Sequence, residues 1–200
     1  EAHEILQHPL RLIGRQHTRL EARSLPRAAG RATRTRPPWT SLQGTGGAAV
    51  TDPHPPANAD MIRYWNEAAG PVWVAMQERL DAQLASLGAA SLARAGLAPG
   101  DRVLDVGCGC GESTLALART VGETGRVLAI DISAPMLARA RARAEQAGLA
   151  GRIEWRCGDA QSEPMPESAF DCLYSRFGVM FFDDPPAAFA NLRRALRSGG

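Results

Sequence analysis

The chain has 200 residues, 44% of them hydrophobic, and a formal net charge of +2. This length suffices for one ordinary domain with a sizeable core, and the apolar fraction is typical of a folded globular chain. No apolar run approaches the ~20 residues that cross a bilayer, and the first residues lack the pattern of a secretory signal. We therefore expect a cytoplasmic protein without a membrane span.

Charge is distributed unevenly along the chain. Residues 1–50 contain eight Arg and three Glu, whereas residues 51–200 contain fifteen Arg and eighteen acidic residues. The second part offers no broad cationic surface, which disfavours nucleic acid as a partner. The four cysteines form no paired CxxC units, so we expect buried thiols, no metal site and no disulfide framework.

Residues 1–57 differ in composition from the rest. They are rich in Arg and Pro and contain little periodic apolar surface, which is typical of a segment that does not fold. We interpret them as a leader that is disordered or not authentic, with a natural start near Val50 or Met61. Residues 58–200 are then the folded domain.

Residues 60–95 have a helical pattern of apolar residues. We expect an interruption at Gly70, with Pro71 in the first turn of a new helix. Gly88 is expected to end that helix, and a shorter helix should follow over residues 89–95. The two tryptophans of the apolar stripe, Trp65 and Trp73, are interpreted as core residues rather than substrate contacts.

Strand and helix patterns alternate over residues 101–200. The predicted strands cover 102–106, 126–131, 152–157 and 169–175, and the predicted helices cover 112–121, 134–146 and 185–197. This alternation predicts an α/β fold, a Rossmann-like, doubly wound and mainly parallel sheet. A further strand should follow the final Gly199-Gly200, so we expect an incomplete sheet of four strands in a chain truncated at its C-terminus.

A glycine-rich turn follows the first predicted strand, in the sequence VLDVGCGCGEST of residues 103–114. Glycine at 107, 109 and 111 permits positive φ and a close approach of the backbone to a ligand. In an open parallel sheet the ligand binds beyond the carboxyl ends of the strands. The turn is therefore a candidate cofactor site.

Two ligand classes compete for such a turn. Dinucleotides favour G-x-G-x-x-G, but Glu112 stands where the third glycine would be, and its carboxylate would repel a pyrophosphate at the helix N-terminus. S-adenosylmethionine (SAM) carries a sulfonium, an ammonium and a single carboxylate, so acidic neighbours are tolerable. This difference favours SAM over a nicotinamide cofactor.

Two further acidic residues follow the next strands. Asp131 ends the second strand, where a carboxylate can accept hydrogen bonds from both ribose hydroxyls of either cofactor. Asp159 follows the third strand in the sequence Gly-Asp-Ala and can accept a hydrogen bond from the adenine amino group. Ile132 and Ala160 could hold the ring between them.

These motifs resemble class I SAM-dependent methyltransferases of the small-molecule group that includes the quinone-biosynthesis enzymes. The resemblance rests on VLDVGCGCGEST, VLAIDIS, GDA and the run FDCLYSRFGVMFFDDPPAAFANLRRALRSGG. It implies SAM as cofactor, a small-molecule acceptor, and a seven-stranded sheet of which three strands are missing here. The cofactor-binding residues that it implies or that the motifs suggest are Asp105, Gly107, Cys108, Gly109, Gly111, Asp131, Ile132, Asp159, Ala160 and Ser175.

Within this set, Asp105 and the backbone of 107–111 would hold the methionine part of SAM, and Ser175-Arg176-Phe177 would lie near the reactive methyl. Structural alternatives stay open: Asp105 can bond turn amides, Asp159 can cap a turn, and Arg176 can be a solvated surface residue. A nicotinamide-dependent oxidoreductase and a non-catalytic SAM-binding module are the alternative functions.

The catalytic residues, the acceptor and the oligomeric state are not identified. All four histidines lie in the leader, at 3, 8, 17 and 54, and Tyr174 and Asp183 are possible general bases on position alone.

Overall fold

A computed structural model describes residues 58–200 of the chain. The interpretation of residues 1–57 as a leader lies outside the described residues. In the described part, no helix is long and apolar enough to span a bilayer.

The segment before the sheet is helical, as predicted, but it divides differently. It forms α2 (Ala59–Arg63), the π-helical turn η1 (Tyr64–Ala68), α3 (Ala69–Ala75) and α4 (Gln77–Arg94). Pro71 does lie in the first turn of α3, whereas the main break comes at Met76 and not at Gly70.

The expected end at Gly88 is wrong, because α4 continues through this residue. Tertiary contacts explain both differences. A Cβ added to Gly70 would lie 2.6 Å from the Ser133 hydroxyl oxygen, and one added to Gly88 would lie 3.0 Å from Nη1 of Arg176. Both glycines therefore serve close packing rather than termination.

The sheet confirms the predicted α/β class. Strands β1 (Arg102–Val106), β2 (Arg126–Asp131), β3 (Ile153–Cys157) and β4 (Cys172–Tyr174) form one parallel sheet in the order β3-β2-β1-β4. Register pairs Asp105 with Ala129 and Tyr174, so the carboxyl ends of these strands meet at one edge.

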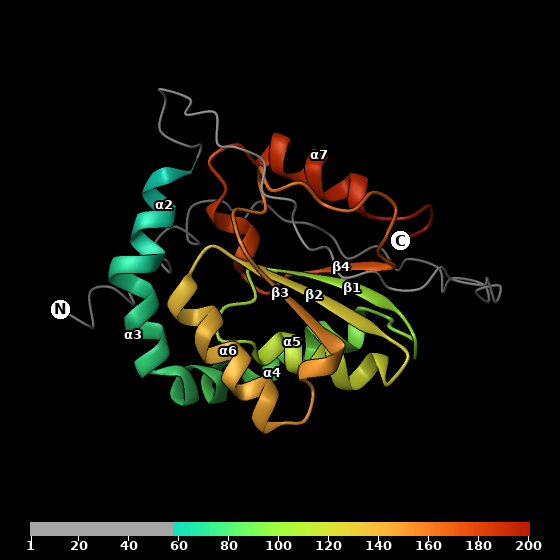
Figure 1. The fold of residues 1–200 in the computed structure, drawn as a ribbon, viewed down its shortest axis with the longest axis horizontal. Coiled ribbons are helices and arrows are strands. Elements are labelled where there is room, and N and C mark those ends of the chain that lie inside the picture. The colour runs from blue at the N-terminus through green and yellow to red at the C-terminus, as the bar shows by residue number, and fades with distance from the viewer. Residues whose placement is uncertain (1–57) are drawn as a thin grey trace. The chain divides into compact units, whose positions relative to one another are not determined.

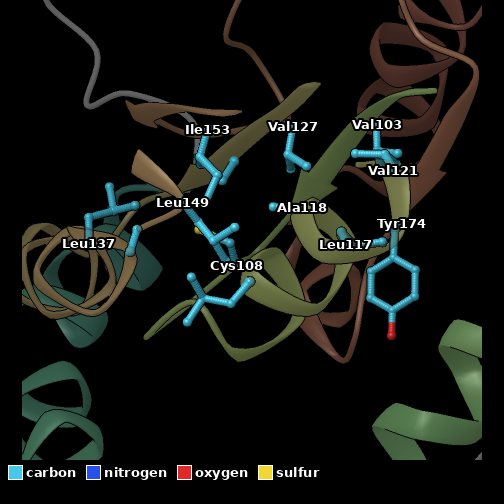
Figure 2. Close-up of a cluster of buried hydrophobic side chains, with 13 residues drawn as sticks. Val103, Cys108, Leu117, Ala118, Val121, Val127, Leu137, Leu149, Ile153 and Tyr174 are labelled. Atoms are coloured by element: carbon cyan, nitrogen blue, oxygen red, sulfur yellow. The ribbon is translucent and has the colours of Figure 1, made fainter. Parts of the chain in front are cut away.

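Helices cover both faces of this sheet. In Figure 1, α5 (Glu112–Val121) and α6 (Ala134–Gln146) lie on one side of the strands, together with α4, and α7 (Pro185–Ala195) lies on the other. The bounds of α5 and α6 are those predicted. The main buried cluster lies between the strands and the helices on the α5 and α6 side. Figure 2 shows its residues Val103, Leu117, Val121, Val127, Leu137 and Ile153.

Strand β4 and helix α7 are shorter than predicted for one reason. Phe170 pairs with Leu196 in an isolated parallel bridge, so the chain leaves α7 at Ala195 and does not continue the helix to 197. Asp171, the next residue, accepts a 2.7 Å hydrogen bond from the backbone of Arg102 and forms an ion pair of 2.5 Å with Arg197. The start of the predicted strand is thus used to anchor the segment after α7.

Candidate functional site

The glycine turn connects β1 to α5 and has the positive φ values that its sequence predicts. Gly107, Gly109 and Gly111 have φ of 69°, 55° and 86°. A Cβ on Gly107 would lie 2.4 Å from Cα of Gly178, and one on Gly111 would lie 2.9 Å from Cβ of Ala140. These two glycines are needed for packing, whereas at Gly109 the nearest atom is the flexible end of Met136, at 3.0 Å.

Asp105 lies behind this turn and is fully buried. One carboxylate oxygen accepts hydrogen bonds from the hydroxyls of Ser113 (2.9 Å) and Thr114 (2.6 Å), in the first turn of α5. The other oxygen, Oδ1, is buried without a hydrogen-bond partner. Burial raises the pKa of Asp105 to about 6, although the two hydroxyls act in the opposite direction.

Asp131 ends β2 beside the same turn. Its Oδ2 accepts the backbone N–H of Gly109 at 2.7 Å, and its Oδ1 accepts that of Ser133 at 2.8 Å. Burial raises the pKa of this carboxyl group, and the backbone hydrogen bonds oppose the shift. The side chain therefore braces the turn, and a ribose would share its oxygens with these two amides.

Asp159 follows β3 and is buried. Its Oδ1 accepts the backbone N–H of Gln161 at 3.0 Å, as expected for a turn cap. Its Oδ2 is buried and has no hydrogen-bond partner. Buried carboxylate oxygens are rarely left without a donor. We therefore interpret this oxygen as an acceptor that a bound ligand can use.

A cavity whose empty space, open solvent included, is about 980 Å³ lies at this edge of the sheet. Seven of the ten predicted cofactor residues line it: Gly107, Cys108, Gly109, Asp131, Ile132, Asp159 and Ala160. Asp105 lies behind the turn, and Gly111, the last residue of the turn, does not line the cavity. Ser175 does not line the cavity either, and its hydroxyl donates to the Val106 carbonyl at 2.8 Å.

Part of the cavity lining is an aromatic wall, formed by Trp65, Trp73, Phe181 and Phe182, and sequence reasoning missed it. Trp65 lies edge-to-face with Trp73 and with Phe181, at centroid distances of 5.7 Å and 5.2 Å. These three residues and Phe182 line the cavity, so the interpretation of the two tryptophans as core residues is wrong. A stripe that faces a cavity has the same spacing as one that faces a core, so periodicity could not separate the two.

Two hydrogen-bonding side chains, Ser133 before α6 and Asn66 of η1, join the aromatic wall to the loop after β2. The Ser133 hydroxyl donates to the Trp65 carbonyl oxygen at 2.7 Å and does not cap α6. Asn66 donates to the carbonyl oxygen of Ile132 at 2.8 Å and accepts from the backbone of Ala134 at 3.0 Å. The π-helical turn is thus fixed to the loop after β2.

Arg143 of α6 changes the interpretation of Glu112. Its guanidinium pairs with Glu112 at 2.6 Å and with Asp81 of α4 at 3.0 Å, and it donates to the Cys110 carbonyl oxygen at 2.7 Å. The charge of Glu112 is therefore largely compensated, and its repulsion of a pyrophosphate is weaker than the sequence alone suggested. Glu112 no longer separates the two cofactor classes.

The cysteines near the turn are unreactive. Cys108 and Cys110 are buried, and burial raises the pKa of Cys110 to about 11 and holds that of Cys108 well above its ordinary value. Residues 58–200 contain no group of three His, Cys, Asp or Glu side chains that could hold a metal ion. Neither Tyr174, which is buried in the core, nor the exposed Asp183 lines the cavity.

Known proteins are similar to the second half of the chain. Residues 103–200 match a family model described as a methyltransferase domain. The ubiquinone/menaquinone biosynthesis C-methyltransferase UbiE of Teredinibacter turnerae is 39% identical over 105 residues, which are 52% of this chain and 42% of that relative.

Solved structures agree on the fold. A SAM-dependent methyltransferase from Aquifex aeolicus aligns with a TM-score of 0.51 and 29% identity, over 55% of this chain and 58% of its own. The [4+2]-cyclase SpnF aligns with a TM-score of 0.53 and 33% identity, over 57% of this chain and 42% of its own.

Residues 103–200 thus match the methyltransferase-domain family and have the fold of a SAM-dependent methyltransferase. Within this class they resemble the C-methyltransferases of quinone biosynthesis, as the motifs indicated. The chain spans 42% of the length of that curated relative.

The cavity fits SAM chemically. SAM offers an adenine amino group, two ribose hydroxyls and an ammonium as donors, and the cavity offers carboxylate acceptors from Asp131 and Asp159. The free Oδ2 of Asp159 is the clearest match, because it lacks a donor that an adenine amino group can supply. Asp105 adds negative charge behind the turn, next to the expected place of the cationic methionine part.

Proposed function

We propose that the protein transfers the methyl group of SAM to a small-molecule acceptor. The observation that carries the proposal is the mixed lining of one cavity. Carboxylates from successive strand ends and the aromatic side chains of Trp65, Trp73 and Phe181 line it together. The carboxylates suit the hydrogen-bond donors of SAM, and the aromatic side chains suit a flat apolar acceptor.

The cofactor roles follow from these positions. Asp159 would accept the adenine amino group, Asp131 the ribose hydroxyls, and the turn at Gly107–Gly109 the methionine part, with Ile132 and Ala160 against the ring. When bound, SAM supplies an activated methyl group on a sulfonium. Asp105 would support the turn from behind, Gly111 would end it, and Ser175 would hold the loop after β4.

The protein side of the reaction is mainly positioning. The aromatic wall would hold the acceptor carbon or oxygen in line with the methyl group and exclude water, which can supply much of the acceleration. The described residues contain no histidine, and neither candidate base lines the cavity. An acceptor that needs little help in losing a proton fits best, such as a hydroquinone or another acidic phenol.

The relatives support this acceptor class and also name the main competitor. The curated relative is named for quinone biosynthesis, which agrees with a flat apolar acceptor. A [4+2]-cyclase shares the fold, so chemistry other than methyl transfer is possible on it. We propose the methyltransferase because the family match and the curated relative agree on it.

Label transfer tests the proposal. Full-length protein is incubated with methyl-labelled SAM and a panel of hydroquinones, simple phenols and amines. We expect label in a hydroquinone or phenol fraction. Binding of SAM without label in any acceptor would favour a non-catalytic SAM-binding module. The expected cytoplasmic location stays a prediction, which cell fractionation tests.

A further inference from the structure

Arg176 lies in the loop that follows β4 and crosses the glycine turn. On one side, the Ser175 hydroxyl is bonded to the Val106 carbonyl at the end of β1. On the other, Gly178 lies against Gly107, so closely that no Cβ fits between them. Phe177 has a φ of 67°, a strained value for a residue with a side chain. The backbone around Arg176 is therefore fixed beside the expected methionine subsite.

The side chain of Arg176 lines the cavity and reaches α4, where its Nη1 lies against Gly88. Within residues 58–200, neither a hydrogen bond nor an ion pair holds its guanidinium. Other arginines of this region are engaged: Arg143 pairs with two carboxylates, and Arg139 donates to Gln77 at 2.9 Å. Asp81 and Asp105 attract this guanidinium from beyond ion-pair distance. A half-buried guanidinium that makes no direct ion pair with a described residue is an unusual feature in a cavity wall.

The charges of the cavity define what this cation can bind. The lining contains the carboxylates of Asp81, Glu112, Asp131 and Asp159, and Arg176 is its single cationic side chain among the described residues. SAM carries one anionic group, the carboxylate of its methionine part. The carboxylates of the lining repel that group, whereas a guanidinium can hold it through two parallel hydrogen bonds.

We propose that Arg176 is the carboxylate-recognition residue of the cavity and pairs with the methionine carboxylate of SAM. The inference rests on the proposed function, since it requires SAM in this cavity. An oxyanion of the acceptor has the same chemistry and is the competing source of the anion. The two sources differ in whether Arg176 affects binding of the cofactor alone.

A matched pair of ligands tests the proposal without knowledge of the acceptor. Decarboxylated SAM differs from SAM by the missing carboxylate. We expect Arg176→Gln in the full chain to weaken SAM binding at least about tenfold and to change binding of decarboxylated SAM by less than about twofold. Arg176→Lys should lie between, because it keeps the charge and loses the fork. Arg119→Gln, the same change on the exposed side of α5, is the control and should leave both affinities unchanged.

Each other outcome overturns the proposal. Equal losses for both ligands would show that Arg176 supports the loop and does not read the carboxylate. Unchanged SAM affinity would show that the guanidinium does not bind the cofactor, and an oxyanion of the acceptor would then be its partner. These results differ from failure of the proposed function itself, in which the unsubstituted chain would bind neither ligand.

Discussion

The two sides of the cavity are built in different ways. The cofactor side consists of a turn and strand ends, where backbone conformation and a few carboxylates determine the geometry. The acceptor side consists of aromatic side chains from the consecutive elements η1 and α3 and from η3 (Gly178–Phe181), which lies far from them in the sequence. The first side has local sequence signals, because glycines and carboxylates must stand at fixed positions after strands. The second depends on packing between distant segments and has none.

Because of this difference, substitutions on the cofactor side can be tested by SAM binding alone, whereas those on the aromatic side need a turnover assay with an acceptor. Substitutions on the cofactor side should change SAM binding. Substitutions on the aromatic side should leave it unchanged and alter turnover.

The largest effect is expected from Gly107→Ala. Its Cβ would lie 2.4 Å from Cα of Gly178, and its φ of 69° is unfavourable for alanine. The two effects together should cost about 2–4 kcal/mol of folding free energy and displace the loop after β4. Thermal unfolding measures the loss. Gly109→Ala is the matched control, since its φ of 55° is also unfavourable for alanine but only the flexible end of Met136 lies near the added Cβ. An equal loss there would contradict the packing role of Gly107.

Asp131→Ala should weaken SAM binding at least about tenfold, because it removes charge-assisted hydrogen bonds of about 1.5–3 kcal/mol. Part of this loss comes from the turn, since the carboxylate also holds the Gly109 amide. Calorimetry gives the affinity, and circular dichroism shows whether the fold is intact. SAM affinity that stays unchanged in a folded variant would remove Asp131 from the site.

Asp105→Asn should raise the free energy of unfolding at neutral pH. The pKa of Asp105 is raised from 3.8 to about 6, so the folded chain binds more protons than the unfolded chain between these values. The unsubstituted protein therefore loses stability as the pH rises through this window. The asparagine variant avoids the loss and should gain about 1–3 kcal/mol relative to it at pH 7, but not below pH 4. Denaturant unfolding at several pH values measures the difference, and a gain that does not grow with pH would contradict the assignment.

The smallest effect on the cofactor is expected from the aromatic side. Trp73→Ala should leave SAM affinity within about twofold and lower kcat/KM for the acceptor about tenfold, from the loss of one aromatic contact surface. Steady-state kinetics with the acceptor found by label transfer checks this. A large loss of SAM affinity would mean that the two sides are not independent.

The bounds of β1, β2, α5 and α6 could be predicted from the sequence because local signals define them. Gly107–Gly111 separates β1 from α5, and Gly148, with a φ of 67°, follows the end of α6. The division of the N-terminal helices could not be predicted. Gly70 and Gly88 look like helix ends, but each makes room for a distant group, the Ser133 hydroxyl and the Arg176 guanidinium respectively.

The site shows the same limit. The acidic residues at the strand ends could be identified, but their present partners could not. Arg143, for example, is one of several arginines on α6, and nothing in the sequence distinguishes the one that compensates Glu112. The aromatic wall was hidden for a related reason, since Trp65 and Phe181 meet only after the chain has folded.

The most direct test of the central claim, that this cavity binds SAM, is calorimetric titration of the full chain with SAM and, separately, with NAD. We predict one site that binds SAM in the micromolar range or tighter, about −8 kcal/mol, and no measurable heat with NAD. Binding of NAD in preference to SAM, or a SAM affinity that Asp159→Ala and Asp131→Ala both leave unchanged, would contradict it.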